Sequence, residues 1–127
     1  MQRDMELIRK IFAEVRARQN LERREVTIEG YDELIVNRHV EMLISKKYLE
    51  GFCNELLNDE SVHCLVRDIT MDGHDFSAVI ENDGVWKKLK ESWTAAEFAS
   101  VPLSVVKEIG TSLLKQYLMQ KAGLSDS

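Results

Sequence analysis

The stretch from Val26 to Glu50 constrains the fold of this chain more than any other. It contains a short extended segment at 26–28, a break at 30–32, a helix of about four turns, and a return to extended chain near Leu49. An amphipathic helix over residues 1–19 precedes this stretch, and hairpin-like sequence follows it. This order of elements predicts a winged helix-turn-helix, in which a helix lies beside a small antiparallel sheet.

The predicted helix from Asp32 to Tyr48 separates into two faces at the helical period. The apolar face should be buried, with His39 as a hydrogen-bonded core residue; its members are Ile35, Val36, Val40, Met42 and Leu43. The second face carries Leu34, Asn37, Arg38, Glu41, Ser45 and Tyr48. Asn37 and Arg38 offer donors to base edges and phosphates, so this face is a candidate for a DNA major groove. A solvated polar face is the simpler interpretation, because Glu41 and the nearby Asp32 and Glu33 would repel phosphate.

Two segments after this helix, residues 49–57 and 62–69, are predicted strands joined by a turn at 58–61. Apolar and polar residues alternate along 62–67, which is the period of a sheet with one solvated face. This hairpin would be the wing. Its tip at Asp59-Glu60 is acidic, which counts against a grip on phosphates.

The two cysteines, Cys53 and Cys64, lie on the facing strands of this hairpin. A disulfide is therefore geometrically conceivable, but the lack of a secretory signal favours free, partly buried thiols. Their spacing is not that of a zinc site. Asp72, His74 and Asp75 are neighbours in one helical turn and point different ways, so we expect no metal and no cofactor.

The remaining sequence predicts a C-terminal helical extension. A helix begins after the N-cap Thr70, residues 82–84 break the chain, another helix follows, and a last helix runs from Pro102 to Gly123. Gly110 normally costs about 1 kcal/mol inside a helix, so we expect a neighbouring element to approach it closely. The apolar band of the last helix must be buried on the body of the protein or on a second copy. The candidate dimer-interface residues are Val106, Ile109, Gly110, Leu113 and Tyr117.

Together these elements predict an α+β, mostly helical protein. Its winged-helix domain covers residues 1–82 and its helical extension covers residues 83–127. No apolar run approaches the roughly 20 residues of a membrane span, so we expect a cytoplasmic protein without membrane contact. The net charge is −5. Residues 1–50 hold ten basic and ten acidic residues, whereas residues 51–127 hold seven and twelve. The acidic excess thus lies outside the predicted DNA-binding helix.

Several segments, taken together and in order, resemble a bacterial and prophage family known as domain of unknown function 2513. They are Arg3-Asp4-Met5-Glu6-Leu7-Ile8-Arg9, Ile28-Glu29-Gly30-Tyr31, His39-Val40-Glu41-Met42-Leu43-Ile44, Thr70-Met71-Asp72-Gly73-His74-Asp75-Phe76 and Trp86-Lys87-Lys88. The resemblance covers most of residues 3–90. It implies a winged-helix-like protein that binds DNA or protein in phage or mobile-element biology, and it supplies no catalytic residues. Winged-helix proteins commonly place Gly in the turn before the wing, where this chain has Lys47.

Two functions follow from this sequence. The first is a small regulator that binds duplex DNA, with the candidate contacts Asn37, Arg38, Lys46, Lys47 and Arg67. The alternative is a protein-interaction module that binds a partner protein or a second copy of itself, which the acidic C-terminal part and the apolar last helix favour. We do not expect an enzyme, because the sequence has no Gly-rich phosphate loop, nucleophile motif or ligand constellation.

Overall fold

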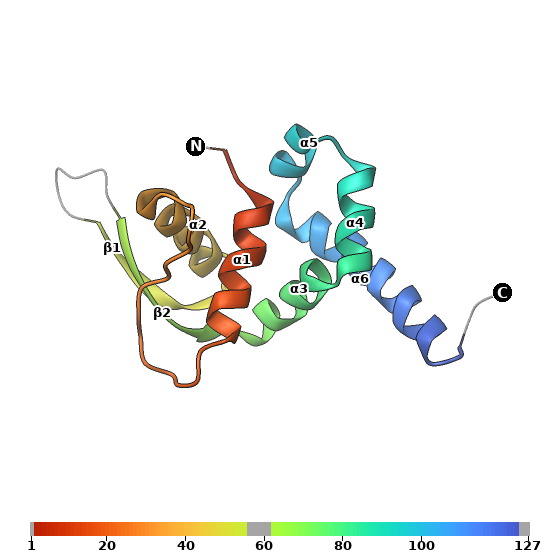
Figure 1. The fold of residues 1–127 in the computed structure, drawn as a ribbon, viewed down its shortest axis with the longest axis horizontal. Coiled ribbons are helices and arrows are strands. Elements are labelled where there is room, and N and C mark those ends of the chain that lie inside the picture. The colour runs from red at the N-terminus through yellow and green to blue at the C-terminus, as the bar shows by residue number, and fades with distance from the viewer. Residues whose placement is uncertain (1, 56–61, 125–127) are drawn as a thin grey trace. The chain divides into compact units, whose positions relative to one another are not determined.

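The computed structural model describes residues 2–55 and 62–124. Within these residues the elements follow in the order α1 (Met5–Arg16), α2 (Glu33–Ser45), β1 (Leu49–Glu55), β2 (Val62–Ile69), α3 (Met71–Glu81), α4 (Asp83–Ser92), α5 (Ala95–Ser100) and α6 (Leu103–Lys121) (Figure 1). The protein is therefore α+β and mostly helical, as predicted. Its chain forms two compact units, Met1–Asp75 and Phe76–Ser127, which divide within α3. The sequence predicts a domain boundary after residue 82, at the break before α4.

In the first unit, α1 and α2 are joined by hydrogen bonds as well as by packing. The Asp4 side chain caps α1 by accepting the Leu7 N–H at 3.1 Å. The backbone N–H of Asp4 donates to Nε2 of His39 at 2.8 Å, and Nδ1 of His39 lies 2.8 Å from the Ile35 carbonyl oxygen. A neutral ring with its proton on Nδ1 satisfies both partners. His39 is fully buried, so the prediction of a hydrogen-bonded core histidine is confirmed.

The sheet of this unit is the predicted antiparallel hairpin. Its register runs from Leu49 opposite Ile69 to Glu55 opposite Val62, with an irregularity between Glu50 and Gly51. The inward residues of β2 are buried, which confirms the predicted alternation: Val62, Cys64 and Val66. Val40 and Leu43 of α2 are fully buried too, as expected for a helix lying on this sheet.

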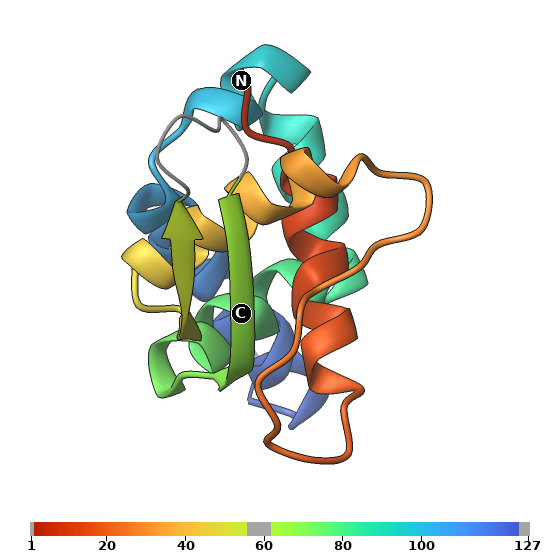
Figure 2. The same ribbon diagram turned by 90° about the vertical axis from the view of Figure 1, so that its left-hand side faces the viewer.

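The expected strand at 26–28 is wrong. A single bridge forms instead at Arg24, which exchanges two backbone hydrogen bonds with Val66 at 3.0 and 2.8 Å. Figure 2 shows the segment between α1 and α2 running alongside β2 at this point. The guanidinium of Arg18 donates to the carbonyls of Val66 at 2.7 Å and Glu25 at 2.9 Å, which fixes the contact there. Beyond it, Val26 is buried as a packed side chain and not as part of a strand.

A helix-turn-helix is not established by these elements. Residues 17–32 separate α1 from α2, whereas the motif joins its helices by a turn of about three or four residues. The predicted wing tip, 58–61, lies outside the described residues, as do 56 and 57 of the first predicted strand. What stands is the coarser description of a helical unit with one antiparallel hairpin.

The end of α2, the start of β1 and the start of α3 meet in one hydrogen-bonded junction. Lys47 has a φ of 64°, and the N–H groups of Lys47 and Tyr48 donate to the carbonyls of Ile44 and Leu43, each at 2.9 Å. These bonds form a Schellman motif, with lysine at the left-handed position that glycine usually takes.

Thr70 closes the junction from the other side. Its hydroxyl donates to the Lys47 carbonyl at 2.6 Å, and its N–H donates to the Tyr48 carbonyl at 3.1 Å. The same hydroxyl accepts the Gly73 N–H at 2.9 Å, which confirms Thr70 as the N-cap of α3. A Cβ at Gly73 would overlap the Tyr48 carbonyl oxygen, so glycine allows the close approach here.

The second unit contains the remaining helices. Asn82 caps α4 by accepting the Val85 N–H at 3.0 Å. The short helix α5 was not predicted; Phe98 from α5 lies 5.3 Å from the Trp86 ring, centroid to centroid. As expected, α6 follows Pro102 and ends just before Gly123, whose φ is 80°; its last helical residue is Lys121. A Cβ at Gly110 would overlap Cγ1 of Val79, which confirms the expected close approach of a neighbouring element.

Candidate functional site

The predicted DNA-contacting face of α2 is rotated from where we expected it. Asn37 is only 2% exposed, and its backbone carbonyl oxygen lies 3.6 Å from Sγ of Cys64. The buried residues of α2 are Val36, Asn37, His39, Val40 and Leu43. Ile35, which we expected inside, is 40% exposed. The sheet covers the side of α2 that carries Asn37. The polarity of the α2 side chains therefore did not predict which side of the helix is buried. Asn37 does not offer its amide to a groove in this structure.

Two of the other predicted phosphate contacts lie beside acids. The Arg38 guanidinium is 3.3 Å from the Glu41 carboxylate, and that of Arg67 is 2.9 Å from the Glu50 carboxylate. These ion pairs reduce the positive potential that would attract a DNA backbone. Lys46 and Lys47 are both exposed at the end of α2.

The candidate dimer interface on α6 is partly internal. Val106 is fully buried and Gly110 packs on Val79, so both lie within the second unit. Leu113 is half-buried, while Ile109 and Tyr117 are exposed. Leu118 is 52% exposed, and Leu124 beyond the helix is also exposed. The available apolar surface therefore lies on the C-terminal part of α6.

The cysteines are joined, contrary to the expectation of free thiols. Cys53 and Cys64 are register partners on β1 and β2, with Cα atoms 4.0 Å apart, and they form a disulfide. The register of the hairpin brings them directly opposite each other. The bond therefore cross-links the hairpin.

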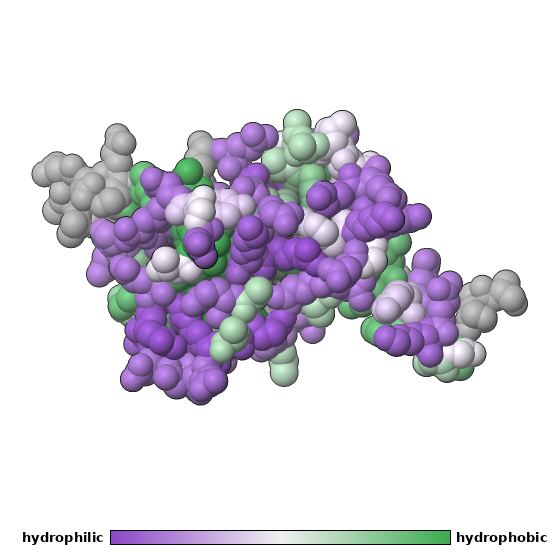
Figure 3. Space-filling view, in the orientation of Figure 1, coloured by the Kyte–Doolittle hydropathy of each residue, from purple (hydrophilic) through white to green (hydrophobic). Residues whose placement is uncertain are grey.

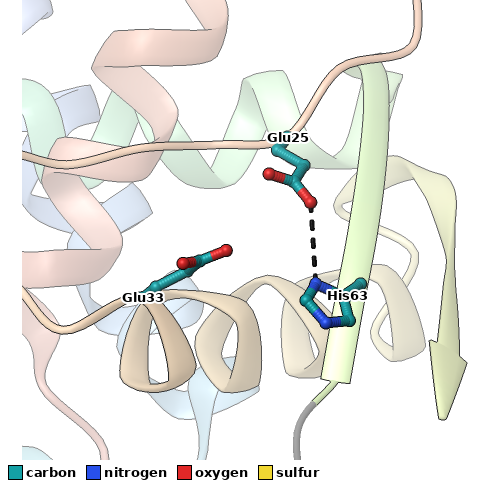
Figure 4. A group of neighbouring side chains, drawn as sticks. All are labelled: Glu25, Glu33 and His63. Carbon is teal, nitrogen blue, oxygen red and sulfur yellow. Dashed lines mark ion pairs between the residues drawn. The ribbon is translucent and has the colours of Figure 1, made fainter. Parts of the chain in front are cut away.

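One group of polar side chains in the first unit was not predicted from the sequence. Glu25, Glu33 and His63 bring one ligand atom each to within 4.8 Å of one another. Glu25 precedes the buried Val26, Glu33 begins α2, and His63 lies on β2 (Figure 4). The residues are far apart in sequence and have no motif spacing. The alternation along β2, which places His63 on the face away from Val62 and Cys64, was the one available signal.

At the junction described above, the phenol of Tyr48 lies in an unfavourable place for a negative charge. Burial raises the pKa of Tyr48, and the charge of Asp72 raises it further. Asp72 lies in the first turn of α3. The raised pKa is thus a local consequence of the close approach of α3 to the end of α2.

None of the helices within residues 2–55 and 62–124 has both the length and the apolar character needed to cross a bilayer.

Comparison with known proteins gives a family without an assigned activity. The family described as "Hypothetical protein (DUF2513)" matches residues 2–99. The chain is also similar to an "Uncharacterized protein" of Haemophilus influenzae, with 26% identity over 120 residues that cover 93% of this chain and 99% of the relative. No solved structure matches.

Proposed function

Because the chain belongs to the DUF2513 family, whose description names no activity, we propose a function from its own surfaces: a non-enzymatic protein-interaction module that self-associates through the C-terminal part of α6. Three observations support this proposal. They are the exposed apolar residues of α6, the arrangement of charges along it, and the acid-paired arginines that weaken the DNA alternative.

The exposed apolar stripe of α6 carries the proposal. Ile109, Leu113 and Tyr117 recur every fourth residue and so lie along one side of the helix. Tyr117 and Leu118 are 43% and 52% exposed. Figure 1 shows this part of α6 extending beyond α4 and α5, and Figure 3 shows apolar residues on it among hydrophilic ones. A row of exposed apolar side chains along one side of a helix is a surface that a partner can cover.

A second copy of the chain is the partner that this stripe fits. Two copies of one stripe that pair antiparallel make a self-complementary interface, the usual form in homodimers. Glu108 lies near one end of the stripe and Lys121 near the other. Antiparallel pairing brings the acid of one copy towards the base of the other, whereas parallel pairing brings like charges together.

Duplex DNA binding is the second candidate function. The exposed Lys46 and Lys47 beside the hairpin favour it, and so does the resemblance of the sequence to winged-helix proteins. It ranks lower because Asn37 is buried and because Arg38 and Arg67 are paired with carboxylates.

Sedimentation velocity over a range of protein concentrations tests self-association. We expect the wild type to shift from monomer to dimer as the concentration rises, and Tyr117→Glu to remain monomeric because a charge then enters the stripe. Gln116→Glu is the matched control, since it adds the same charge beside the stripe and should still dimerise. A wild type that is monomeric throughout the range contradicts the proposal.

Fluorescence anisotropy with a labelled duplex tests the second candidate. DNA binding through Lys46 and Lys47 predicts an affinity that falls steeply between about 50 and 200 mM salt. It also predicts weaker binding by a Lys46→Gln/Lys47→Gln variant. The absence of salt-dependent binding would remove the DNA candidate and leave self-association unaffected.

A further inference from the structure

We propose that Glu25, Glu33 and His63 form a binding site for a divalent transition-metal ion of the zinc class. The site lies within the first unit and is separate from the α6 surface. It therefore does not depend on self-association.

The three side chains point towards a common space, as Figure 4 shows. Nδ1 of His63 is 3.6 Å from Oε1 of Glu25, and the ligand atoms of all three residues lie within 4.8 Å of one another. Around a tetrahedral zinc ion with bonds of about 2.1 Å, neighbouring ligand atoms are about 3.4 Å apart. The His63–Glu25 pair nearly has this separation already. The carboxylate of the exposed Glu33, which lies within 4.8 Å of the other two ligand atoms, would supply the third ligand.

The backbones that carry these ligands are held in place by other contacts. Arg24, next to Glu25, is paired with Val66 of β2 by two backbone hydrogen bonds. The Arg18 guanidinium bonds the Glu25 carbonyl at 2.9 Å. On α2, the Asp32 side chain caps the helix by accepting the Leu34 N–H at 2.9 Å, which fixes the turn that contains Glu33. Because the backbones are already positioned, an ion has to order only the three exposed side chains.

A second observation comes from Asn37, one helical turn after Glu33 and on the same side of α2. Its side chain is buried at 2% exposure, and Oδ1 has no hydrogen-bond partner among the residues that the structure describes. A buried amide oxygen without a donor needs an explanation. A donor held on the Glu33 side of α2, such as a water molecule in the coordination position that the three side chains leave open, is one group that could satisfy this oxygen.

The ligand types select the class of metal. One imidazole nitrogen with two carboxylate oxygens suits zinc and related transition metals, whereas magnesium and calcium prefer oxygen ligands alone. Because the ligands come from the connector, α2 and β2, a bound ion would join these three segments and stabilise the folded unit.

Isothermal titration of the full-length, disulfide-bonded protein with zinc chloride tests the site. We expect one ion per chain for the wild type, and no comparable binding of magnesium. Loss of a residue that only supports a metal ligand already weakens metal binding about 10- to 100-fold. His63→Ala and Glu33→Gln each remove a ligand, so each should weaken zinc binding at least about tenfold. His74→Ala is the matched control, because this exposed imidazole lies in α3 outside the group and should bind zinc as the wild type does.

Thermal unfolding gives a second readout. Zinc should raise the midpoint of the wild type and of His74→Ala, and should raise that of Glu33→Gln by clearly less at the same zinc concentration. If His63→Ala does not fold, Glu33→Gln decides the result. The proposal is overturned if the wild type binds no stoichiometric zinc, or if Glu33→Gln binds it as tightly as the wild type.

Discussion

At the scale of single residues, His39 joins the start of α1 to α2 through both ring nitrogens. Replacing His39 with Phe keeps an aromatic ring there but leaves the Asp4 N–H and the Ile35 carbonyl without the ring as a partner. We expect the free energy of unfolding to fall by about 1–3 kcal/mol, measured by urea denaturation. His74→Ala, at an exposed position, should change it by less than about 0.5 kcal/mol. An equal effect of the two substitutions would contradict this role for His39.

Tyr48 predicts how stability depends on alkaline pH. Its pKa is raised in the folded state by burial and by Asp72, so the fold favours the neutral phenol. This contribution is fully present below the ordinary tyrosine pKa of 10.0 and is lost as the pH rises through the higher folded value. Denaturation midpoints measured between neutral and alkaline pH should therefore decline less for Tyr48→Phe than for the wild type. Asp72→Asn should lower the Tyr48 pKa in an absorbance titration, and an unchanged titration would exclude the contribution of Asp72.

Residue-level prediction from the sequence succeeded along the middle of the buried face of α2 and failed on its two flanks. Val40 and Leu43 lie inside, as the helical period indicated. Asn37 and Ile35 exchanged their expected places because burial on a helix flank depends on which element covers it, and the sequence of α2 does not contain that information.

At the scale of elements, the contact between Gly110 of α6 and Val79 of α3 opposes helix propensity. Alanine would improve the helix by about 1 kcal/mol, but its Cβ would overlap Val79 Cγ1, and overpacking costs about 1–3 kcal/mol. We expect Gly110→Ala to lower the melting temperature. Gly84→Ala is the matched control, since the nearest atom to its Cβ is Asn82 Oδ1 at 3.4 Å, and it should leave the melting temperature unchanged or raise it. The double variant Val79→Ala/Gly110→Ala should lose less stability than the sum of the two single changes; strict additivity would show that the two sites do not contact.

Element prediction from the sequence was most successful where a period extends over several turns or several strand residues. The long helices and the hairpin were found, and Pro102 and Gly123 marked the limits of α6. Helix α5 was missed, although Thr94 and Glu97 form a capping box; the six-residue helix is too short to show a period. The strand expected at 26–28 failed because alternation indicates an extended chain but not a pairing partner.

At the scale of the whole molecule, the sequence predicted the family and the mostly helical class, and both are confirmed. It did not predict the group of Glu25, Glu33 and His63. These residues meet only because the connector, α2 and β2 converge, and no local pattern records contacts over such sequence distances. The sequence allowed the Cys53–Cys64 disulfide on geometry, but the expectation of free thiols is wrong, because the hairpin register places the two cysteines opposite each other.

The junction at Thr70 gives the hairpin a fastened stem. Thr70 donates hydrogen bonds to the carbonyls of both Lys47 and Tyr48. The end of α2 and the start of α3 are therefore joined at one hydrogen-bonded junction. We therefore expect a displacement of β1 and β2 to reach the end of α2 and the beginning of α3 together. A partner that displaces the hairpin would therefore act on α2 and α3 together.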